Sequence, residues 1–555
     1  MVPFQKIRMM VLTGVLTGIL AFGFYTVGES DLFLKLHRSI DLFGKVYKEV
    51  AVNYVDDIDP DEFMRSGIDG MLKTLDPYTV YLGEKENDEI DLVTTGKYGG
   101  VGITIGVRDG MVTVVGLMEG FSAARQGIQT GDRIIEIEGT KIIGGVMDQV
   151  RLLVRGAPGT ELRMKIERDD EAQPLEFVLL REEIPVRNVT YAGYVEPGIG
   201  YIRLERFSRT AGDDVRQAVK ELRSSGTLQA LVLDLRDNPG GLLDVAVDVS
   251  SKFLPESSLV VSTRGRKSDT ERKYYSTGKP MLVDIPLAVL VNRNSASASE
   301  IVAGAIQDLD RGVIVGTRSF GKGLVQTITR LSETASLKIT TARYYTPSGR
   351  SIQEVDYTHR NGDGTYATKP DSLRRVFHTA HNRSVLEGGG IVPDSTVDEE
   401  EHSKLYQELM RKAMFFKYAN RYASQQKTVP ERFEVTDEML KDFENFLREK
   451  KFDYKSDAEL KLRELRDVAE QSGYGKPFLE NVDRLKAIAE SEKATALQRH
   501  KKEVQTALRG EILGRLKGEK GRIDGTIHED RQLTTSVALL KERKIYDRLL
   551  SGKKR

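Results

Sequence analysis

The stretch VNRNSASASEIVAGAIQDLDRGVIVGTRSFGKGLVQ, residues 291–326, decides the fold that we expect for this chain. The apolar run at residues 287–291 predicts a buried strand, and the small residues after it predict a tight turn and a helix over residues 300–307. A second apolar run, residues 312–316, predicts another strand before the glycine-flanked Lys322. Strands and helices that alternate in this way predict an α/β core.

A serine in the predicted turn would lie beside free backbone N–H groups and the positive end of the helix dipole, where a developing oxyanion is stabilised. A serine hydroxyl needs a base, usually histidine, but no histidine lies between His37 and His359. Lys322 is the more plausible base, provided that its surroundings lower its pKa from about 10.4 to about 7 to 8. Each motif alone also fits a plain structural turn.

The two runs together resemble the catalytic core of the carboxy-terminal processing (tail-specific) serine proteases, which carry S-A-S-A-S-E and F-G-K-G at this separation. By this resemblance the nucleophile falls on Ser297, the general base on Lys322 and an assisting glutamine on Gln326. The similarity continues in TPSGRSIQ, residues 346–353, and in GGGIVPD, residues 388–394. The resemblance implies a crotonase-like and ClpP-like α/β protease core.

The run RDNPGG, residues 236–241, follows a predicted buried strand at residues 230–235. In the resembled family this turn supplies one backbone N–H to the oxyanion hole, and the residue after the nucleophile supplies the other. The donors implied here are Gly241, with Gly240 as the alternative, and Ala298. By themselves the glycines also fit a structural turn between a strand and a helix.

Residues 99–183 resemble a PDZ domain. Ile103, Ile105 and Val107 alternate as in a half-buried strand, and residues 122–139, SAARQGIQTGDRIIEIEG, are similar to the PDZ signature of bacterial proteases. In PDZ domains a glycine-rich loop before this strand receives a chain-terminal carboxylate, while the strand edge pairs with the peptide. The peptide-binding residues predicted by this resemblance are Gly99, Gly100, Val101, Gly102 and Ile103.

Residues 9–28 are uncharged and long enough, at about 1.5 Å per residue, to cross a hydrocarbon core of about 30 Å. Lys6 and Arg8 precede this run, while Glu29 and Asp31 follow it, so the positive-inside rule predicts a signal anchor that exports the rest of the chain. A cleaved signal peptide is the alternative, although the run lacks a clear A-x-A site. The absence of cysteine suits an oxidising compartment.

The chain carries 83 basic and 83 acidic residues, so its charge balance gives no reason to expect a nucleic-acid partner. His359, His378 and His381 lie in a polar segment at irregular spacing, which favours a solvated insertion over a metal site. No metal or organic cofactor is expected.

After residue 399 the sequence predicts long charged helices, including residues 458–470 and 484–516, in a solvated bundle. The basic end, residues 541–555, favours a solvated tail. An amphipathic helical face is predicted from the spacing of Met439, Leu440, Phe443, Phe446 and Leu447.

The expected organisation has six parts. The resemblance implies that one of them, the N-terminal helical region, can dimerise. The parts are a cytoplasmic N-terminus (1–8), a transmembrane signal anchor (9–28), an N-terminal helical region (30–92), a PDZ domain (96–184), a tail-specific protease core (185–398) and a charged helical C-terminal domain (399–555).

The sequence thus predicts a serine endopeptidase that cleaves exported proteins near their C-terminal tails after PDZ-mediated recognition. We expect it in a bacterial cell envelope, anchored to the inner membrane with its catalytic part in the periplasm. Expected partners are proteins with flexible apolar C-terminal tails, the membrane, a second copy of the chain and an adaptor or regulator. The alternatives are a catalytically silent PDZ scaffold or tail-binding chaperone on a protease fold, and an acyl-CoA enzyme.

Overall fold

The computed structural model describes residues 32–83, 95–169, 171–266, 270–360, 366–426, 428–430 and 432–551. The predicted signal anchor, residues 9–28, lies outside them. Among the helices that the structure does describe, none combines the length and the apolar character needed to span a membrane. The chain divides into two compact units, residues 1–81 and residues 82–555.

The larger unit contains a six-stranded sheet in the order β10-β11-β12-β15-β16-β23. Neighbouring strands from β11 to β23 run parallel, and β10 joins β11 antiparallel at one edge. The strands are β10 (Val189–Glu196), β11 (Ile199–Leu204), β12 (Ala230–Asp234), β15 (Leu287–Val291), β16 (Val313–Gly316) and β23 (Ser395–Thr396).

Side chains along each central strand alternate between two apolar layers. In β12, Leu231 and Leu233 pack on one side of the sheet, whereas Val232 packs on the other. The first side is covered by α6 (Ala211–Ser225), α7 (Leu243–Ser251) and α8 (Ala298–Asp308). The predicted α/β core is confirmed, and α8 begins two residues before the predicted start at Glu300.

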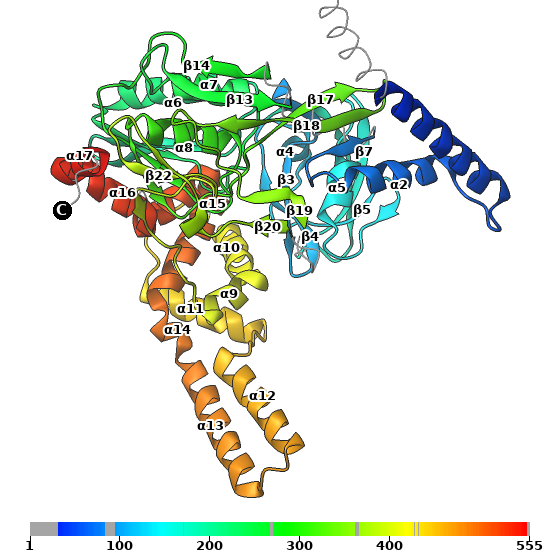
Figure 1. Cartoon of the computed structure of the whole chain (residues 1–555). Coiled ribbons are helices and arrows are strands. Elements are labelled where there is room, and N and C mark those ends of the chain that lie inside the picture. The colour runs from blue at the N-terminus through cyan, green and yellow to red at the C-terminus, as the bar shows by residue number, and fades with distance from the viewer. Residues whose placement is uncertain are drawn as a thin grey trace, which may run out of the picture. The chain divides into compact units, whose positions relative to one another are not determined.

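The other side of the sheet is covered by the last two helices of the chain, α16 (Arg531–Lys541) and α17 (Arg543–Ser551), drawn in red in Figure 1. Leu533, Val537 and Tyr546 are buried against the sheet. The prediction of a solvated basic tail at residues 541–555 is therefore wrong for its described part. A parallel sheet needs cover on both faces, and these helices supply the second layer.

A second sheet in the core joins β18 to both β13 and β17, with β14 paired to β13. Its strands are β13 (Leu259–Gly265), β14 (Arg272–Tyr275), β17 (Leu324–Arg330) and β18 (Ser336–Tyr345). The glycine-flanked Lys322 lies just before β17. The chain thus enters this sheet directly from the predicted site.

The polar segment after β18 forms short hairpins where a loop was expected. Its strands are β19 (Val355–Arg360), β20 (Tyr366–Thr368), β21 (Val376–His378) and β22 (Ser384–Leu386). The Nδ1 of His381 lies 3.1 Å from the carbonyl oxygen of Leu550 and 3.6 Å from a carboxylate oxygen of Asp310. Within the described ranges, no three His, Cys, Asp or Glu side chains form a group that could hold a metal ion.

Before α16 the described chain forms a series of helices, most of which share a separate apolar cluster. They are α9 (Lys404–Arg411), α10 (Met414–Gln425), α11 (Asp437–Glu449), α12 (Asp457–Gln471), α13 (Lys476–Ala494), α14 (Ala496–Arg499) and α15 (Lys501–Thr526). The amphipathic face of α11 is confirmed, because Leu440, Phe443, Phe446 and Leu447 are buried. The single helix predicted over residues 484–516 is wrong, since α13 ends at Ala494 and α15 starts at Lys501. The break lets α13 pair with α12 while α15 packs on α10.

A third sheet, in the order β3-β4-β5-β7-β8 with β6 paired to β5, covers the predicted PDZ region. Its strands are β3 (Ile103–Arg108), β4 (Met111–Leu117), β5 (Arg133–Ile137), β6 (Thr140–Lys141), β7 (Glu161–Glu167) and β8 (Leu175–Leu180), and its helices are α4 (Ser122–Gln126) and α5 (Met147–Val154). A separate two-stranded ribbon joins β2 (Lys97–Gly100) to β9 (Glu182–Pro185).

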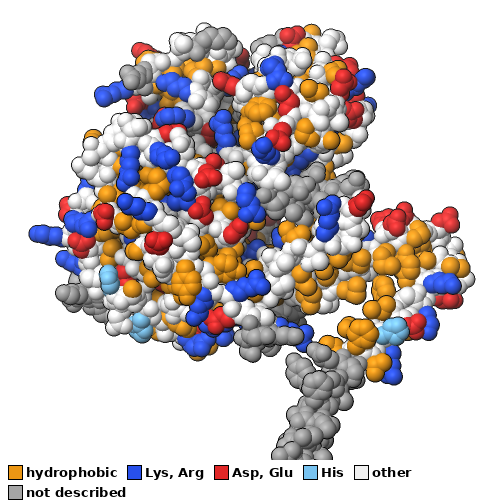
Figure 2. Space-filling view, turned by 90° about the horizontal axis from the view of Figure 1, so that it is seen from above, with side chains coloured by type: hydrophobic (Ala, Val, Ile, Leu, Met, Phe, Trp, Pro, Cys, Tyr) orange, Lys and Arg blue, Asp and Glu red, His pale blue; other side chains and the backbone are white. Residues whose placement is uncertain are grey.

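In the smaller unit, residues 32–53 are helical and precede α2 (Pro60–Leu72). The two helices are joined by a ring stack, with centroids of Tyr47 and Phe63 5.4 Å apart, and by a hydrogen bond of 2.7 Å from the Tyr47 hydroxyl to the Pro60 carbonyl. Apolar side chains remain exposed on this unit (Figure 2), among them Leu32, Phe33, Leu34, Leu36, Ile40, Leu42, Phe43, Val46, Val52, Tyr54 and Val55.

We expect Tyr546→Ala to destabilise the core by about 3 to 5 kcal/mol, the cost typical of removing a buried aromatic side chain. Tyr546 is 2% exposed, and its hydroxyl lies within hydrogen-bond distance of both the N–H and the carbonyl of Leu287 in β15. Thermal unfolding measured by circular dichroism would report the loss. Tyr474→Ala is the matched control, because Tyr474 is exposed. Equal melting temperatures for the two variants would contradict the packing of α17 on the sheet.

Candidate active site

Ser297 lies in the turn between β15 and α8, with φ 56° and ψ −112°. This backbone conformation is uncommon for a residue with a side chain and is found mainly where a functional group must be aimed. The other two serines of the SASAS run are buried, and their hydroxyls donate to the backbone carbonyls of Leu235 and Asn238. Ser297 is therefore the serine of this run that is partly exposed.

The turn at residues 236–241 packs directly against Ser297. A Cβ atom added to Gly240 would lie 2.9 Å from the Cβ of Ser297 and 2.8 Å from the amide nitrogen of Ala298, so this position accepts only glycine. The Gly240 N–H donates to Oδ1 of Asn238 at 2.9 Å. In the part of the chain that the structure describes, the N–H groups of Gly241 and Ala298 have no hydrogen-bond acceptor.

Glu300, in the first turn of α8, joins the serine turn to the lysine loop. Its Oε2 accepts from the N–H of Ser297 at 2.9 Å and from the N–H of Lys322 at 2.9 Å. Its Oε1 accepts from the hydroxyl of Ser319 at 2.6 Å and from the N–H of Gly321 at 2.7 Å. Glu300 is completely buried, and burial raises the pKa of its carboxyl to about 7 against the opposite effect of its four donors.

Tyr344, in β18, makes a second link between the same two residues. Its hydroxyl lies 3.2 Å from the carbonyl oxygen of Ser297 and 2.5 Å from that of Lys322. The ring is 1% exposed and packs in the main apolar cluster of the core. Glu300 thus holds the backbones of Ser297 and Lys322 together at their N–H groups. The single proton of the Tyr344 hydroxyl lies between their carbonyls, with the shorter contact to Lys322.

Lys322 is half-buried in the loop that leads into β17. Gln326 is also half-buried, and its Nε2 lies 3.3 Å from Oγ1 of Thr340 on the neighbouring strand. A register shift between Val325 and Gln326 interrupts the pairing of β17 with β18 at this point. The structure therefore brings the backbones of Ser297 and Lys322 together and ties Gln326 to Thr340.

Comparison with known proteins now identifies the family. Residues 198–359 match Peptidase family S41. The carboxy-terminal-processing protease of Bartonella bacilliformis is 38% identical over 343 residues, which are 61% of this chain and 77% of that protein. The chain belongs to the carboxy-terminal-processing protease family. It is a serine-type protease of the S41 class with a PDZ domain.

Other parts of this family member also match known proteins. Residues 113–168 match the PDZ domain, residues 405–540 the "Probable PDZ-protease, C-terminal helical domain" and residues 29–86 the "Activating protease CtpB N-terminal domain". The carboxyl-terminal-processing protease of Synechocystis is 35% identical over 52% of this chain and 68% of that protein. The solved structure of the photosystem II D1 C-terminal processing protease shares 27% identity, with a TM-score of 0.33, over 64% of this chain and 92% of that one.

The PDZ domain of this carboxy-terminal-processing protease presents β3 as an edge strand of its sheet, next to α5. Of the predicted peptide-binding residues, Gly99 and Gly100 lie in β2 and pair with β9. Val101 is buried, and its carbonyl accepts from the N–H of Ala123. Gly102 has φ 80°, and Ile103 opens β3. The open loop expected at Gly99 and Gly100 is thus a paired strand, followed by a turn at the sheet edge.

Sequence reasoning did not assign Glu300 and Tyr344 to the protease site. The signal for Glu300 is its place three residues after Ser297, the S-x-x-E spacing typical of a helix start whose glutamate reaches back to the capping residue. Tyr344 stands in an ordinary strand pattern, ARYY, which carries no such signal. Its role follows from the pairing of β18 with β17, which brings it to the lysine loop.

We expect Tyr344→Phe to lower the kcat of peptide hydrolysis about tenfold with little change in KM, because misplaced catalytic groups reduce the rate of the chemical step. The substitution keeps the ring and removes the hydroxyl that reaches the carbonyls of Ser297 and Lys322. Tyr345→Phe is the matched control, since the neighbouring ring packs under the guanidinium of Arg264 at 4.3 Å. Steady-state kinetics on a fluorogenic peptide would compare the two variants, and equal kcat values would contradict the role of Tyr344.

We also expect activity to fall as the pH drops through about 7, where Glu300 takes up a proton. Three of the four neighbours are backbone N–H groups, which can only donate, so protonation removes the negative charge that strengthens their hydrogen bonds to Glu300. Glu300→Gln should be weakly active at every pH, because an amide also places a donor there. In the pH–rate profile of this variant, the fall in activity below about pH 7 that we attribute to Glu300 should be absent.

The control for this pH profile is Glu354→Gln, which changes a carboxylate paired with Arg374. Rates of peptide cleavage between about pH 5 and 9 would be compared for the three proteins. A Glu300→Gln protein with the activity and the acidic midpoint of the wild type would show that Glu300 does not control the site.

Proposed function

We propose that this protease cleaves peptide bonds with Ser297 as nucleophile and Lys322 as general base. The Ser297 oxygen attacks the peptide carbonyl while its proton passes to the lysine amine. The ammonium returns that proton to the leaving amine, so the peptide bond breaks and an ester to Ser297 remains. Water then attacks the ester, with Lys322 again taking a proton, and regenerates the serine.

One observation carries this proposal: a single carboxylate oxygen of Glu300 accepts hydrogen bonds from the N–H groups of both Ser297 and Lys322. Two residues far apart on the chain therefore share one anchoring atom at the end of α8. The strained backbone of Ser297 and its partial exposure support its choice over Ser295 and Ser299.

We assign the oxyanion contacts to the N–H groups of Gly241 and Ala298. The support for Gly241 over the alternative, Gly240, is that the Gly240 N–H already donates to Asn238. Ala298 is the first residue of α8, where the helix dipole adds positive potential. Gln326 is proposed to orient the lysine amine from β17. The parallel sheet covered by α6, α7 and α8 supports a crotonase-like and ClpP-like description of the core.

We propose that the PDZ domain selects substrates by their flexible apolar C-terminal tails. The support is the edge position of β3, whose free side can accept a peptide as an added strand, with the turn at Val101 and Gly102 at its start. The substrates are then exported proteins that are cut near their C-termini.

The location follows from the sequence: we propose an inner-membrane anchor at residues 9–28 and a catalytic part in the periplasm. Self-association through the N-terminal unit is supported by the apolar side chains exposed there, since large exposed apolar surfaces mark interaction sites. The helices between residues 404 and 499 are proposed to receive an adaptor or regulator.

The decisive experiment incubates the purified protein with an unfolded protein that ends in an apolar tail and follows the products by mass spectrometry. We expect cleavage by the wild type and a loss of at least about a thousandfold in rate for Ser297→Ala and Lys322→Ala, because the two residues act as one unit. Ser224→Ala is the control, since this exposed hydroxyl donates to the carbonyl of Glu221 within its own helix.

A second arm uses the same substrate with an amidated C-terminus, which removes the carboxylate that PDZ recognition requires. Slower cleavage of the amidated form with an unchanged set of cut sites would support tail recognition. If both site variants still cleave, the Ser/Lys assignment is wrong. Binding without cleavage by the wild type would instead favour a catalytically silent scaffold.

A further inference from the structure

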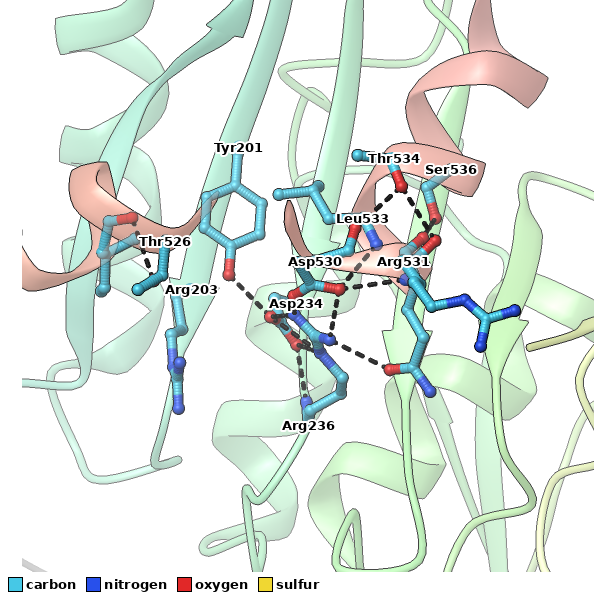
Figure 3. Close-up of polar contacts among 12 residues, drawn as sticks. Tyr201, Arg203, Asp234, Arg236, Thr526, Asp530, Arg531, Leu533, Thr534 and Ser536 are labelled. Atoms are coloured by element: carbon cyan, nitrogen blue, oxygen red, sulfur yellow. Dashed lines mark hydrogen bonds and ion pairs between the residues drawn. The ribbon is translucent and has the colours of Figure 1, made fainter. Parts of the chain in front are cut away.

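Arg236, the first residue of the oxyanion turn, is held between two carboxylates (Figure 3). On one side Asp234 accepts from the Arg236 guanidinium at 2.6 to 3.1 Å and from the Arg236 backbone N–H at 2.9 Å. Asp234 is fully buried and also accepts from the hydroxyl of Tyr201 at 2.7 Å. Burial alone would raise the pKa of Asp234, but the charge of Arg236 holds it below its usual value.

The second carboxylate comes from the other end of the chain. Asp530 accepts from the Arg236 guanidinium at 2.6 and 3.1 Å, although the two residues are 294 positions apart. Its carboxylate also caps α16, accepting from the N–H groups of Gln532 and Leu533 at 3.0 Å. The side chain of Gln532 adds a contact of 3.0 Å to Arg236 and donates to the carbonyl of Val397.

The position of Asp530 has an electrostatic reason. Arg236 points its positive charge at the N-terminus of α16, which carries partial positive charge of its own. The Asp530 carboxylate lies between the two and offsets both. Without that negative charge, the guanidinium would face an unfavourable helix dipole and would tend to move away from α16.

Movement of Arg236 would reach the oxyanion turn, because the next residues are bonded into the serine turn. The Asp237 carboxylate accepts from the side chains of Asn292 and Asn294 at 2.9 and 2.8 Å. The Asn238 carbonyl accepts from the N–H of Ala296 at 3.0 Å. The turn that ends at Gly241 is thus fixed to the serine side by Asp237 and Asn238, and to α16 by Arg236.

We propose that Asp530 is a positioning residue for the oxyanion turn, so that the C-terminal helix α16 acts as part of the catalytic domain. This inference rests on the proposed role of the Gly241 N–H. It assigns a task to a residue outside the matched peptidase segment, residues 198–359. Asp530 acts through Arg236 and does not itself touch the substrate.

The test is Asp530→Asn in the full chain. Asparagine still caps a helix, so α16 should remain folded, but the charge that holds Arg236 is lost. We expect kcat for a fluorogenic peptide to fall about ten- to a hundredfold with KM within about twofold, the pattern of an interaction used mainly in the transition state. Affinity for a peptide aldehyde, whose adduct carries an oxyanion, should fall in parallel, while thermal unfolding should change little.

The matched control is Asp547→Asn, which removes the same charge from the neighbouring helix α17. Asp547 is exposed and pairs with Arg543 of its own helix at 3.1 Å. This variant should keep the kcat and the aldehyde affinity of the wild type. Wild-type kcat in Asp530→Asn, or a loss equal to that of the control, would overturn the proposal.

Amide hydrogen exchange is a second test of the proposal, and it does not depend on catalysis. In the Ser297→Ala background, Asp530→Asn should speed amide exchange in the peptide that covers residues 236–242, with no change across α8. If the wild type cleaves nothing, the proposed protease chemistry is wrong. The exchange rates at residues 236–242 still show whether Asp530 holds the oxyanion turn. Unchanged exchange at residues 236–242 would refute the coupling even in an active enzyme.

Discussion

One buried carboxylate sets the geometry on which the rest of the site depends. Glu300 accepts four hydrogen bonds, one from the serine turn and three from the loop that carries Lys322. Burying a charge in the core is costly unless every lone pair finds a donor, and here four donors meet it. Because these donors belong to two segments, satisfying the carboxylate also fixes the spacing between the backbones of Ser297 and Lys322, the proposed nucleophile and base. The same hydrogen bonds of Glu300 therefore stabilise the start of α8 and fix the arrangement of the site.

The local part of this arrangement could be predicted from the sequence. Apolar runs bounded by small residues predict β15, β16 and the turn at Ser297, because strand periodicity and turn chemistry are local properties. The family resemblance implied Gly241 as an oxyanion donor, with Gly240 as the alternative. The carboxamide of Asn238, which binds the N–H of Gly240, supports the proposal of Gly241. Backbone geometry of this kind does not follow from residue types.

Contacts between distant segments account for what the sequence did not reveal. Tyr344 reaches Ser297 and Lys322 only because β17 and β18 form a hairpin, and Asp530 meets Arg236 across 294 positions. The charged residues of the C-terminal region predict solvated helices, and most of α12 and α13 fits that description. The basic residues of α17, however, alternate with a buried Tyr546, so a net positive segment still packs on the core. The average charge of a segment reflects the side chains on the solvent side of a helix and does not reveal apolar side chains on its buried side.

The cover on the second face of the core sheet gives the chain an order of assembly. The strand β23, at the edge of the sheet, ends at Thr396, yet α16 starts only at Arg531, so the ribosome completes the sheet and the serine turn long before it makes the helices that bury them. The ribosome adds about 5 to 20 residues per second. While it makes the residues between β23 and α16, one apolar face of the core sheet stays uncovered. Once residues 530–551 have been made, they close the sheet and bring Asp530 to Arg236. A chain interrupted before its end would carry all the proposed catalytic residues and lack the layer that holds them in place.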